Sequence, residues 1–281
     1  MFRNVLGLEV LVLELDGKVA IVTGGNSGIG KAVAEIFARE KAKVVIAARN
    51  EKNGAQTVDG IRRNGGTASF VKTDMREPAQ VKRLIDETVR VHGTIDVLCN
   101  NAGVEFLKPL IDTTVEEWDF VVNTNLRGLF LASKYAIPHM MMKKKGVIVN
   151  IASQLGVSAL EGLSVYCTTK AGIMMLTRVM ALECIPHGIR VNCVCPGAID
   201  TPMVDREVAL DKDPDVARRI MAGRHPIGRL GTPEEVAEAV LFMASDRASF
   251  IVGECLLVDG GYVTGPSGRL HWTPPSTESI F

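Results

Sequence analysis

The chain has 281 residues, 47% hydrophobic and 23% charged, a composition typical of a globular protein able to bury a full core. Its 32 basic and 32 acidic residues give a formal net charge of +0 without long runs of one sign. Nucleic-acid binding needs a clustered basic surface and is therefore disfavoured. Residues 1–14 are apolar but contain Glu9 and Glu14, so they predict an N-terminal extension and no membrane span or secretion signal.

Short runs rich in Val, Ile, Leu and Cys alternate with longer segments of helical periodicity. The strand-like runs are residues 18–24, 43–49, 68–74, 95–101, 146–153, 189–197 and 254–261, and the helical segments include 28–40, 78–92, 115–138 and 165–185. Several runs are almost continuously apolar, which is typical of parallel strands covered on both faces. The alternation predicts an α/β fold with a doubly wound parallel sheet, in one domain over residues 15–262.

Two helix starts and two irregular segments punctuate this pattern. Thr114 and Thr232 each precede a Glu by three residues, which is the capping-box spacing. Residues 200–226 form a long, charged connection with three prolines, and residues 263–281 form a C-terminal tail. Long connections inside compact domains are usually functional lids or disordered, and we expect a substrate lid over 200–226.

The six cysteines fit neither a zinc template nor a disulfide framework. They are Cys99, Cys167, Cys184, Cys193, Cys195 and Cys255, and we expect reduced thiols in a cytoplasmic protein. Cys193 and Cys195 alternate along an apolar run, so both side chains should point to the same side of a buried strand. The five histidines are scattered, and no metal site is predicted.

A glycine-rich loop, "TGGNSGIG" over residues 23–30, lies between the first strand-like run and a helical segment. Glycines allow a tight turn and close backbone approach, and the start of a helix presents free N–H groups and a positive dipole to an anion. The loop, with Gly24, Gly28 and Gly30 as its main positions, is therefore predicted to hold the phosphates of a dinucleotide. A merely tight turn is the alternative.

The residue after the second strand-like run indicates which cofactor is bound. Dinucleotide-binding folds usually carry an acidic residue there to hold the ribose 2′-hydroxyl. This chain has Ala48 and then Arg49, and a guanidinium suits a 2′-phosphate. We therefore predict NADP(H) in preference to NAD(H). The alternative is that Arg49 is a surface residue and either cofactor binds.

Tyr166 and Lys170 are four residues apart in "YCTTK", which places them on one face of a helix. A cation beside a phenol lowers the pKa of the phenol, which would help it to move a proton near neutral pH. Tyr-x-x-x-Lys also arises often by chance in ordinary helices. The motif alone is therefore a weak indication of catalysis, and the other motifs of the chain decide its interpretation.

Four motifs stand in order along this one α/β chain. They are "TGGNSGIG", then "NNAG" over 100–103, then Ser153 closing the fifth strand-like run, then "YCTTK" over 166–170. With "NTNLRG", "PGAIDT" and "VDGG", they resemble the short-chain dehydrogenase/reductase family over roughly residues 16–262. The resemblance implies a Rossmann-type sheet of seven parallel strands. It also implies reversible hydride transfer between a nicotinamide and a carbonyl or alcohol.

The resemblance further implies four catalytic residues. Tyr166 would be the general acid/base, and Lys170 would tune it and bind the nicotinamide ribose. Ser153 would polarise the substrate oxygen, and Asn125 would hold a water that relays protons. Ser153 could instead cap a strand, and Asn125 could be a polar residue that bends its helix.

The implied ligand contacts extend over most of the chain. For the cofactor they are Gly24, Asn26, Ser27, Gly28, Ile29, Gly30, Arg49, Asp74, Met75, Asn101, Ala102, Gly103, Tyr166, Lys170, Pro196, Gly197, Ile199 and Thr201, and for the substrate Ser153, Gln154 and Tyr166. Asp74 could instead cap the next helix. The carboxyl ends of parallel strands are where open α/β sheets bind ligands, in agreement with these positions.

Substrate choice is expected to come from residues 104–109, 154–164 and the lid. The second of these carries Leu155, Val157, Leu160 and Leu163, which predicts an apolar pocket for an alicyclic, steroid-like or 3-oxoacyl substrate. Packing of these side chains on a neighbouring helix is the alternative.

The family commonly forms homotetramers through the helices of residues 115–138 and 165–185, so a homotetramer, or a homodimer, is expected. The competing functions are an NAD(H)-dependent dehydrogenase, a relative that catalyses dehydration or epimerisation, and a catalytically silent cofactor-binding regulator.

Overall fold

The computed structural model describes residues 2–3, 9–10 and 13–265, and its centre is a seven-stranded sheet in the order β5-β4-β3-β6-β7-β8-β9. Every neighbouring pair is parallel. The strands are β3 Val19–Thr23, β4 Lys43–Ala48, β5 Thr67–Lys72, β6 Val97–Asn100, β7 Gly146–Ile151, β8 Ile189–Pro196 and β9 Cys255–Val258. Each overlaps one predicted run, so the doubly wound parallel sheet is confirmed.

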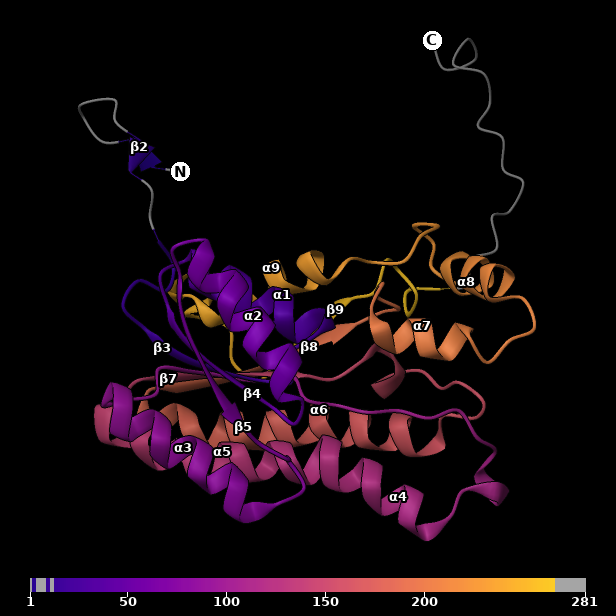
Figure 1. The fold of residues 1–281 in the computed structure, drawn as a ribbon, viewed down its shortest axis with the longest axis horizontal. Coiled ribbons are helices and arrows are strands. Elements are labelled where there is room, and N and C mark those ends of the chain that lie inside the picture. The colour runs from indigo at the N-terminus through magenta and orange to yellow at the C-terminus, as the bar shows by residue number, and fades with distance from the viewer. Residues whose placement is uncertain (1, 4–8, 11–12, 266–281) are drawn as a thin grey trace.

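Helices cover both faces of this sheet (Figure 1). In chain order they are α1 Gly28–Arg39, α2 Glu51–Arg63, α3 Pro78–His92, α4 Val115–Val122, α5 Gly128–Lys143, α6 Ser164–Cys184, α7 Pro202–Val208, α8 Pro214–Gly223 and α9 Pro233–Ala244. α1, α2 and α9 lie on one face, and α3, α5 and α6 lie on the other. The capping boxes predicted at Thr114 and Thr232 are both formed.

The core consists of two apolar clusters, one on each face of the sheet. Neighbouring residues of β3 show why its sequence is continuously apolar: Val22 packs into one cluster and Ile21 into the other, and both are fully buried. Cys193 and Cys195 lie in the same cluster with their Sγ atoms 3.8 Å apart, as their spacing predicts.

The helix predicted over residues 115–138 differs in two respects. A π-helical segment, Asn123–Arg127, separates α4 from α5, and α5 continues through Pro138 to Lys143. A proline removes one helical hydrogen bond, and here the following turn still buries Met140 completely. π-helical insertions occur often at functional sites, and Asn125 lies fully buried in this one.

The connection predicted as a lid contains two helices, α7 and α8. Pro202 and Pro214 are the first residues of these helices, where a missing N–H costs nothing. Arg218 of α8 forms ion pairs with Asp200 and with Asp205 of α7. At the base of this excursion Ile199 forms a parallel bridge with Gly231, so the chain leaves and returns at neighbouring positions.

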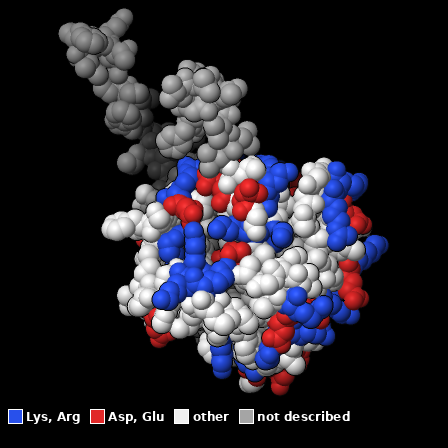
Figure 2. All heavy atoms as spheres, turned by 90° about the vertical axis from the view of Figure 1, so that its left-hand side faces the viewer, with Lys and Arg blue, Asp and Glu red and all other residues white. Residues whose placement is uncertain are grey.

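Most of the predicted N-terminal extension (1–14) and C-terminal tail (263–281) lies outside the described residues. Within the extension, β1 Phe2–Arg3 pairs antiparallel with β2 Glu9–Val10. Basic and acidic side chains are interspersed on the face drawn in Figure 2. None of the helices in the described part of the chain is long and apolar enough to cross a membrane.

Candidate active site

A cleft of about 680 Å³ opens at the carboxyl ends of the strands. It runs past the junction of β3 and β6, where the order in which the strands are added to the sheet reverses. Open α/β sheets bind ligands at such a point. Its lining contains every residue that the resemblance assigns to cofactor or substrate: Gly24, Asn26, Ser27, Gly28, Ile29, Gly30, Arg49, Asp74, Met75, Asn101, Ala102, Gly103, Ser153, Gln154, Tyr166, Lys170, Pro196, Gly197, Ile199 and Thr201. Asn125 lies behind this lining.

The glycine loop before α1 has the geometry of a phosphate cradle. Gly24 and Gly28 have φ angles of +67° and +51°, in the left-handed region that favours glycine. A Cβ on Gly30 would lie 2.3 Å from the Gly24 carbonyl oxygen. Ser27 makes no side-chain capping bond to α1, and the first residues of that helix, Gly28 to Gly30, line the cleft. These residues fit the pyrophosphate of a dinucleotide.

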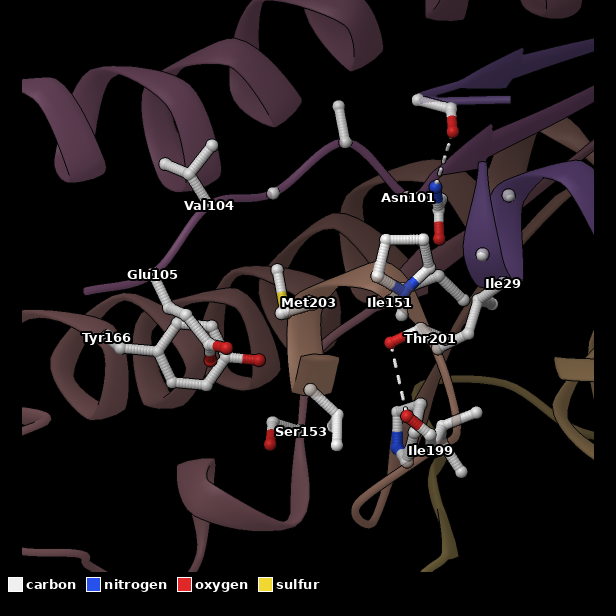
Figure 3. Close-up of a pocket in the computed structure, with 18 of the residues that line it drawn as sticks. Ile29, Asn101, Val104, Glu105, Ile151, Ser153, Tyr166, Ile199, Thr201 and Met203 are labelled. Atoms are coloured by element: carbon white, nitrogen blue, oxygen red, sulfur yellow. Dashed lines mark hydrogen bonds between the residues drawn. The ribbon is translucent and has the colours of Figure 1, made fainter. Parts of the chain in front are cut away.

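Asn101 forms the wall opposite this loop. The Thr23 hydroxyl accepts the backbone N–H of Asn101 at 3.0 Å and of Ala102 at 3.1 Å. The Asn101 amide donates to the Thr23 carbonyl at 2.9 Å and to the Gly24 carbonyl at 3.4 Å. Figure 3 shows the Asn101 side chain among the residues that line the cleft. The "NNAG" stretch is therefore held against the end of β3, and its backbone lines the cleft.

Asp74 and Arg49 lie at the far end of the cleft. Arg76 binds the Asp74 carboxylate through two guanidinium nitrogens, at 3.0 and 2.6 Å, and this pairing holds the Asp74 pKa below its usual value. The cap of α3 is Glu77, so Asp74 does not cap that helix. Arg49 follows β4, is exposed, and lies 6.0 Å from the centre of the Phe120 ring.

Tyr166 and Lys170 face the cleft from α6. The Lys170 ammonium donates to the Ile151 carbonyl at 2.9 Å and lies 5.3 Å from the centre of the Tyr166 ring. Burial lowers the Lys170 pKa to about 8. Burial raises the Tyr166 pKa above its ordinary value, and the Glu105 charge raises it further.

The prediction that Lys170 lowers the Tyr166 pKa is therefore wrong for this structure. The i, i+4 spacing brings the two side chains together as expected. The Lys170 ammonium, however, lies over the Tyr166 ring and donates its hydrogen bond to the Ile151 carbonyl at the end of β7. Burial and the nearby carboxylate then decide the direction of the shift.

Ser153 follows β7, and its hydroxyl accepts the Leu155 N–H at 3.1 Å. It therefore caps the next turn, as the alternative interpretation suggests, but it also lies close enough to Tyr166 to offset part of the rise in the phenol pKa. Asn125 supports the site from behind, through two hydrogen bonds to Val104 and one to Thr169 of α6.

Known proteins resemble this chain over most of its length. A family model described as enoyl-(acyl carrier protein) reductase matches residues 24–263. The cis-4-hydroxycyclohexanecarboxylate dehydrogenase of Sinomonas cyclohexanicum is 44% identical over 87% of this chain and 96% of its own length. The 3-oxoacyl-(acyl-carrier-protein) reductase of Thermotoga maritima is 38% identical over 89% of this chain and 100% of its own. A short-chain type dehydrogenase/reductase from Mycobacterium marinum superposes with a TM-score of 0.85 at 34% identity, over 90% of this chain and 98% of that one.

The chain belongs to the short-chain dehydrogenase/reductase family. Like its relatives it is an oxidoreductase that acts on CH–OH groups. The family cofactors are NAD(H) and NADP(H), and the glycine cradle fits the pyrophosphate that both contain.

The substrate end of the cleft departs from the predicted apolar pocket. Leu155, Leu160 and Leu163 line it, whereas Val157 is 53% exposed and lies outside. Charged residues that the sequence reasoning did not single out also line it: Glu105, Arg206, Glu207 and Arg224. All four fall within the segments expected to choose the substrate. The signal available in the sequence was Glu105, a charged residue directly after "NNAGV".

Several neutral residues of the lining also went unpredicted, among them Met203, Met221, His225 and Tyr262. His225 is 3% exposed, and its Nε2 accepts the Ala198 N–H at 3.1 Å, so it supports the loop after β8. Gln154 is buried, and its Oε1 has no hydrogen-bond partner among residues 13–265. Gln154 and His225 thus place polar side-chain atoms beside Gly197.

Proposed function

We propose that this protein is an NADP(H)-dependent oxidoreductase that interconverts an alicyclic secondary alcohol and its ketone. The observation that carries the proposal is the convergence of Tyr166, Ser153 and Lys170 at one end of a cleft with a glycine cradle at its other end. A catalytically silent regulator would need none of these three side chains in place.

The residues divide the chemistry as follows. When bound, the nicotinamide supplies or accepts the hydride. The Tyr166 hydroxyl gives its proton to the substrate oxygen during reduction and takes one back during oxidation. The Ser153 hydroxyl hydrogen-bonds the same oxygen and stabilises its developing charge. Because the Tyr166 pKa is raised, the phenol is protonated at neutral pH, which is the form that reduction requires.

Arg49 supports NADP(H) in preference to NAD(H). It follows β4 in the cleft lining, where an NAD(H)-binding site usually carries a carboxylate. The carboxylate of Asp74 lies at the same end, but it is paired with Arg76. The guanidinium of Arg49 has no ion-pair partner in the described part of the chain, so a 2′-phosphate would supply one.

Two relatives indicate different substrates. The 44% identical relative is named for an alicyclic alcohol, and the 38% identical relative is named for a 3-oxoacyl group on a carrier protein. Leu155, Leu160 and Leu163 provide apolar contact that suits a ring or a chain. We favour the ring because the charged residues Glu105 and Glu207 also face this end, where an acyl chain would have to lie.

We further propose a homotetramer in the cytoplasm. The apolar side chains of Phe130, Met175, Val179 and Leu182 on α5 and α6 are 43–75% exposed, which suits a subunit contact. All six cysteines are free thiols, as expected in a reducing compartment.

The test follows the absorbance of NADPH or NADH with the purified protein and a panel of alicyclic ketones, including cyclohexanone and cyclopentanone. We expect oxidation of NADPH at a higher kcat/KM than of NADH. Activity on 3-oxoacyl thioesters alone would replace the alicyclic substrate. Tight cofactor binding without turnover of any ketone or alcohol would contradict the proposal.

A further inference from the structure

Glu105 is a carboxylate without a partner inside the cleft. It lines the cleft directly after Val104, and it makes no hydrogen bond or ion pair with any residue between 13 and 265. A cation is available in the same segment, because Lys108 lies three residues further on, but Lys108 pairs with Glu117 at 2.8 Å. The Glu105 carboxylate is therefore free to accept a hydrogen bond from a ligand in the cleft.

The backbone on both sides of Glu105 is fixed. Both polar groups of the preceding residue, Val104, are bound by the Asn125 side chain. The Lys108 N–H donates to the Gly162 carbonyl at 2.9 Å, which ties the segment to the loop before α6. A carboxylate on such a segment is positioned in advance, as a recognition site requires.

The surroundings of Glu105 place it beside the reacting groups. Figure 3 draws its side chain over the Tyr166 ring, and its charge has the largest effect of any charge on the Tyr166 pKa. Burial raises the pKa of Glu105 itself to about 7; the Glu207 charge raises it further, whereas Lys170 and Arg206 lower it. Burial likewise raises the pKa of Glu207, from α7, and the Arg224 charge lowers it.

We propose that Glu105 is a specificity-determining residue that accepts a hydrogen bond from a second hydroxyl group of the substrate, on a carbon next to the reacting carbon. Glu105 is half-buried, and an acceptor that a bound substrate shuts off from water is unfavourable unless the substrate supplies a donor. A substrate with a hydroxyl at this place therefore binds better than an analogue without one. The position beside Tyr166 puts this hydroxyl close to the reacting oxygen. Leu155, Leu160 and Leu163 remain for the rest of the ring. The substrate class is therefore alicyclic vicinal diols and their hydroxyketones, an inference that rests on the proposed function.

The test compares kcat/KM for 2-hydroxycyclohexanone and 2-methoxycyclohexanone, which share an oxygen but differ in the donor. We expect the wild type to favour the hydroxyketone about ten- to a hundredfold, the value of one hydrogen bond to a charged group. Glu105→Leu should bring this ratio to within about threefold of unity, and Glu105→Gln, a weaker acceptor, should give an intermediate ratio. Glu161→Leu is the matched control, since Glu161 is exposed on the facing loop, and it should keep the wild-type ratio.

The ratio cancels any effect of Glu105 on Tyr166 that both ketones share. A wild-type ratio near unity, or an unchanged ratio in both Glu105 variants, overturns the inference. If Glu105→Leu does not fold, the ratio of the isosteric Glu105→Gln decides alone. Turnover of cyclohexanone without the hydroxyl preference sinks only this inference, whereas absence of any ketone turnover in the wild type sinks the proposed function.

Discussion

The Asn125 side chain binds both backbone polar groups of Val104. Its Oδ1 accepts the Val104 N–H at 2.8 Å, and its Nδ2 donates to the Val104 carbonyl at 2.9 Å. The same Nδ2 lies 3.2 Å from the hydroxyl of Thr169, which is on the helix of Tyr166 and Lys170. One amide thus joins the π-helical segment, the chain after β6 and α6, so it fixes Glu105 and Tyr166 relative to each other.

Asn125→Ala should destabilise the fold as well as the site. It leaves the Val104 N–H and carbonyl without partners, and each buried unsatisfied group costs about 1–3 kcal/mol. We expect the free energy of unfolding in urea to fall by roughly 2–4 kcal/mol. The control is Asn123→Ala in the same π-helical segment, since the Asn123 side chain makes no hydrogen bond with described residues, and its loss should stay below about 1 kcal/mol. Equal losses in both variants would argue against this role.

Tyr166→Phe removes the hydroxyl and keeps the ring. Loss of a positioned acid/base should lower kcat by about 10²- to 10⁴-fold, while the Kd for NADPH stays within about twofold of wild type. Steady-state kinetics and fluorescence titration measure the two quantities. Tyr135→Phe on α5 is the matched control and should leave both unchanged, since Tyr135 packs against the core away from the cleft. Turnover retained by Tyr166→Phe would refute the assignment.

Arg49→Ala tests the cofactor assignment. If the guanidinium binds the 2′-phosphate, its removal should raise the Kd for NADPH about ten- to a hundredfold and change the Kd for NADH by less than about threefold. Lys52→Ala controls for the loss of a nearby positive charge, because Lys52 is exposed on the first turn of α2. The opposite result, a selective loss of NADH affinity, would assign NAD(H).

Glu105 should make stability depend on pH. Burial raises its pKa from 4.5 to about 7 with Glu207, Lys170 and Arg206 around it, so the folded state favours the neutral carboxyl. The stability from that neutral form is complete below pH 4.5 and is lost as the pH rises through about 7. Glu105→Gln cannot titrate at this position. As the pH rises between these values, its free energy of unfolding should therefore increase relative to that of the wild type by about 1–3 kcal/mol.

The measurement is urea unfolding of both proteins at pH 4.5, 6 and 8. Glu161→Gln, an exposed carboxylate on the facing loop, corrects for the removal of one charge. A difference between wild type and Glu105→Gln that stays constant across this range would show that Glu105 is not held in the environment described.

Leu182→Lys should disrupt the proposed tetramer. Leu182 is 75% exposed on α6, and a lysine in a subunit contact would bury an unpaired charge. Light scattering after size exclusion should report a smaller assembly, with each subunit still folded by circular dichroism. Val91→Lys is the control, on an apolar side chain of α3 that is 59% exposed. A wild-type monomer at micromolar concentration would dismiss the proposal directly.

The strands were predictable because their burial is a local property. A strand such as β8 is covered on both faces, so every residue from Ile189 to Pro196 is buried and the run is mostly apolar, with Arg190 and Asn192 as the exceptions. The capping boxes at Thr114 and Thr232 are equally local. The cleft lining followed from the resemblance, since its motifs lie at strand ends that the parallel order brings to one edge.

The features that escaped prediction depend on tertiary contacts. The π-helical segment accompanies the bonds from Asn125 to Val104, 21 residues away in sequence. Pro202 and Pro214 begin α7 and α8, but in a sequence a proline is typical both of a chain break and of a first helical position. The spacing of Tyr166 and Lys170 gives proximity but does not reveal that Ile151 holds the ammonium. The sequence pattern does not distinguish Glu105 from a solvated carboxylate. Only the hydrogen bonds of Asn125 and Gly162 to its segment show how it is held in the cleft.

The bridge between Ile199 and Gly231 closes the base of the excursion that carries α7 and α8. That excursion supplies Met203, Arg206, Glu207, Met221 and Arg224 to the cleft, while Ser153, Tyr166 and Lys170 all come from other parts of the chain. Part of the surface around the substrate therefore comes from a different piece of the chain than the groups that transfer the proton. A graft of residues 200–230 from a relative would enter and leave the fold at two neighbouring backbone positions, and it would have to keep the hydrogen bonds from Ala198 to His225 and from Ile227 to Gly260. Exchange of this segment would then change the alcohols that are accepted while Ser153, Tyr166 and Lys170 stay in place.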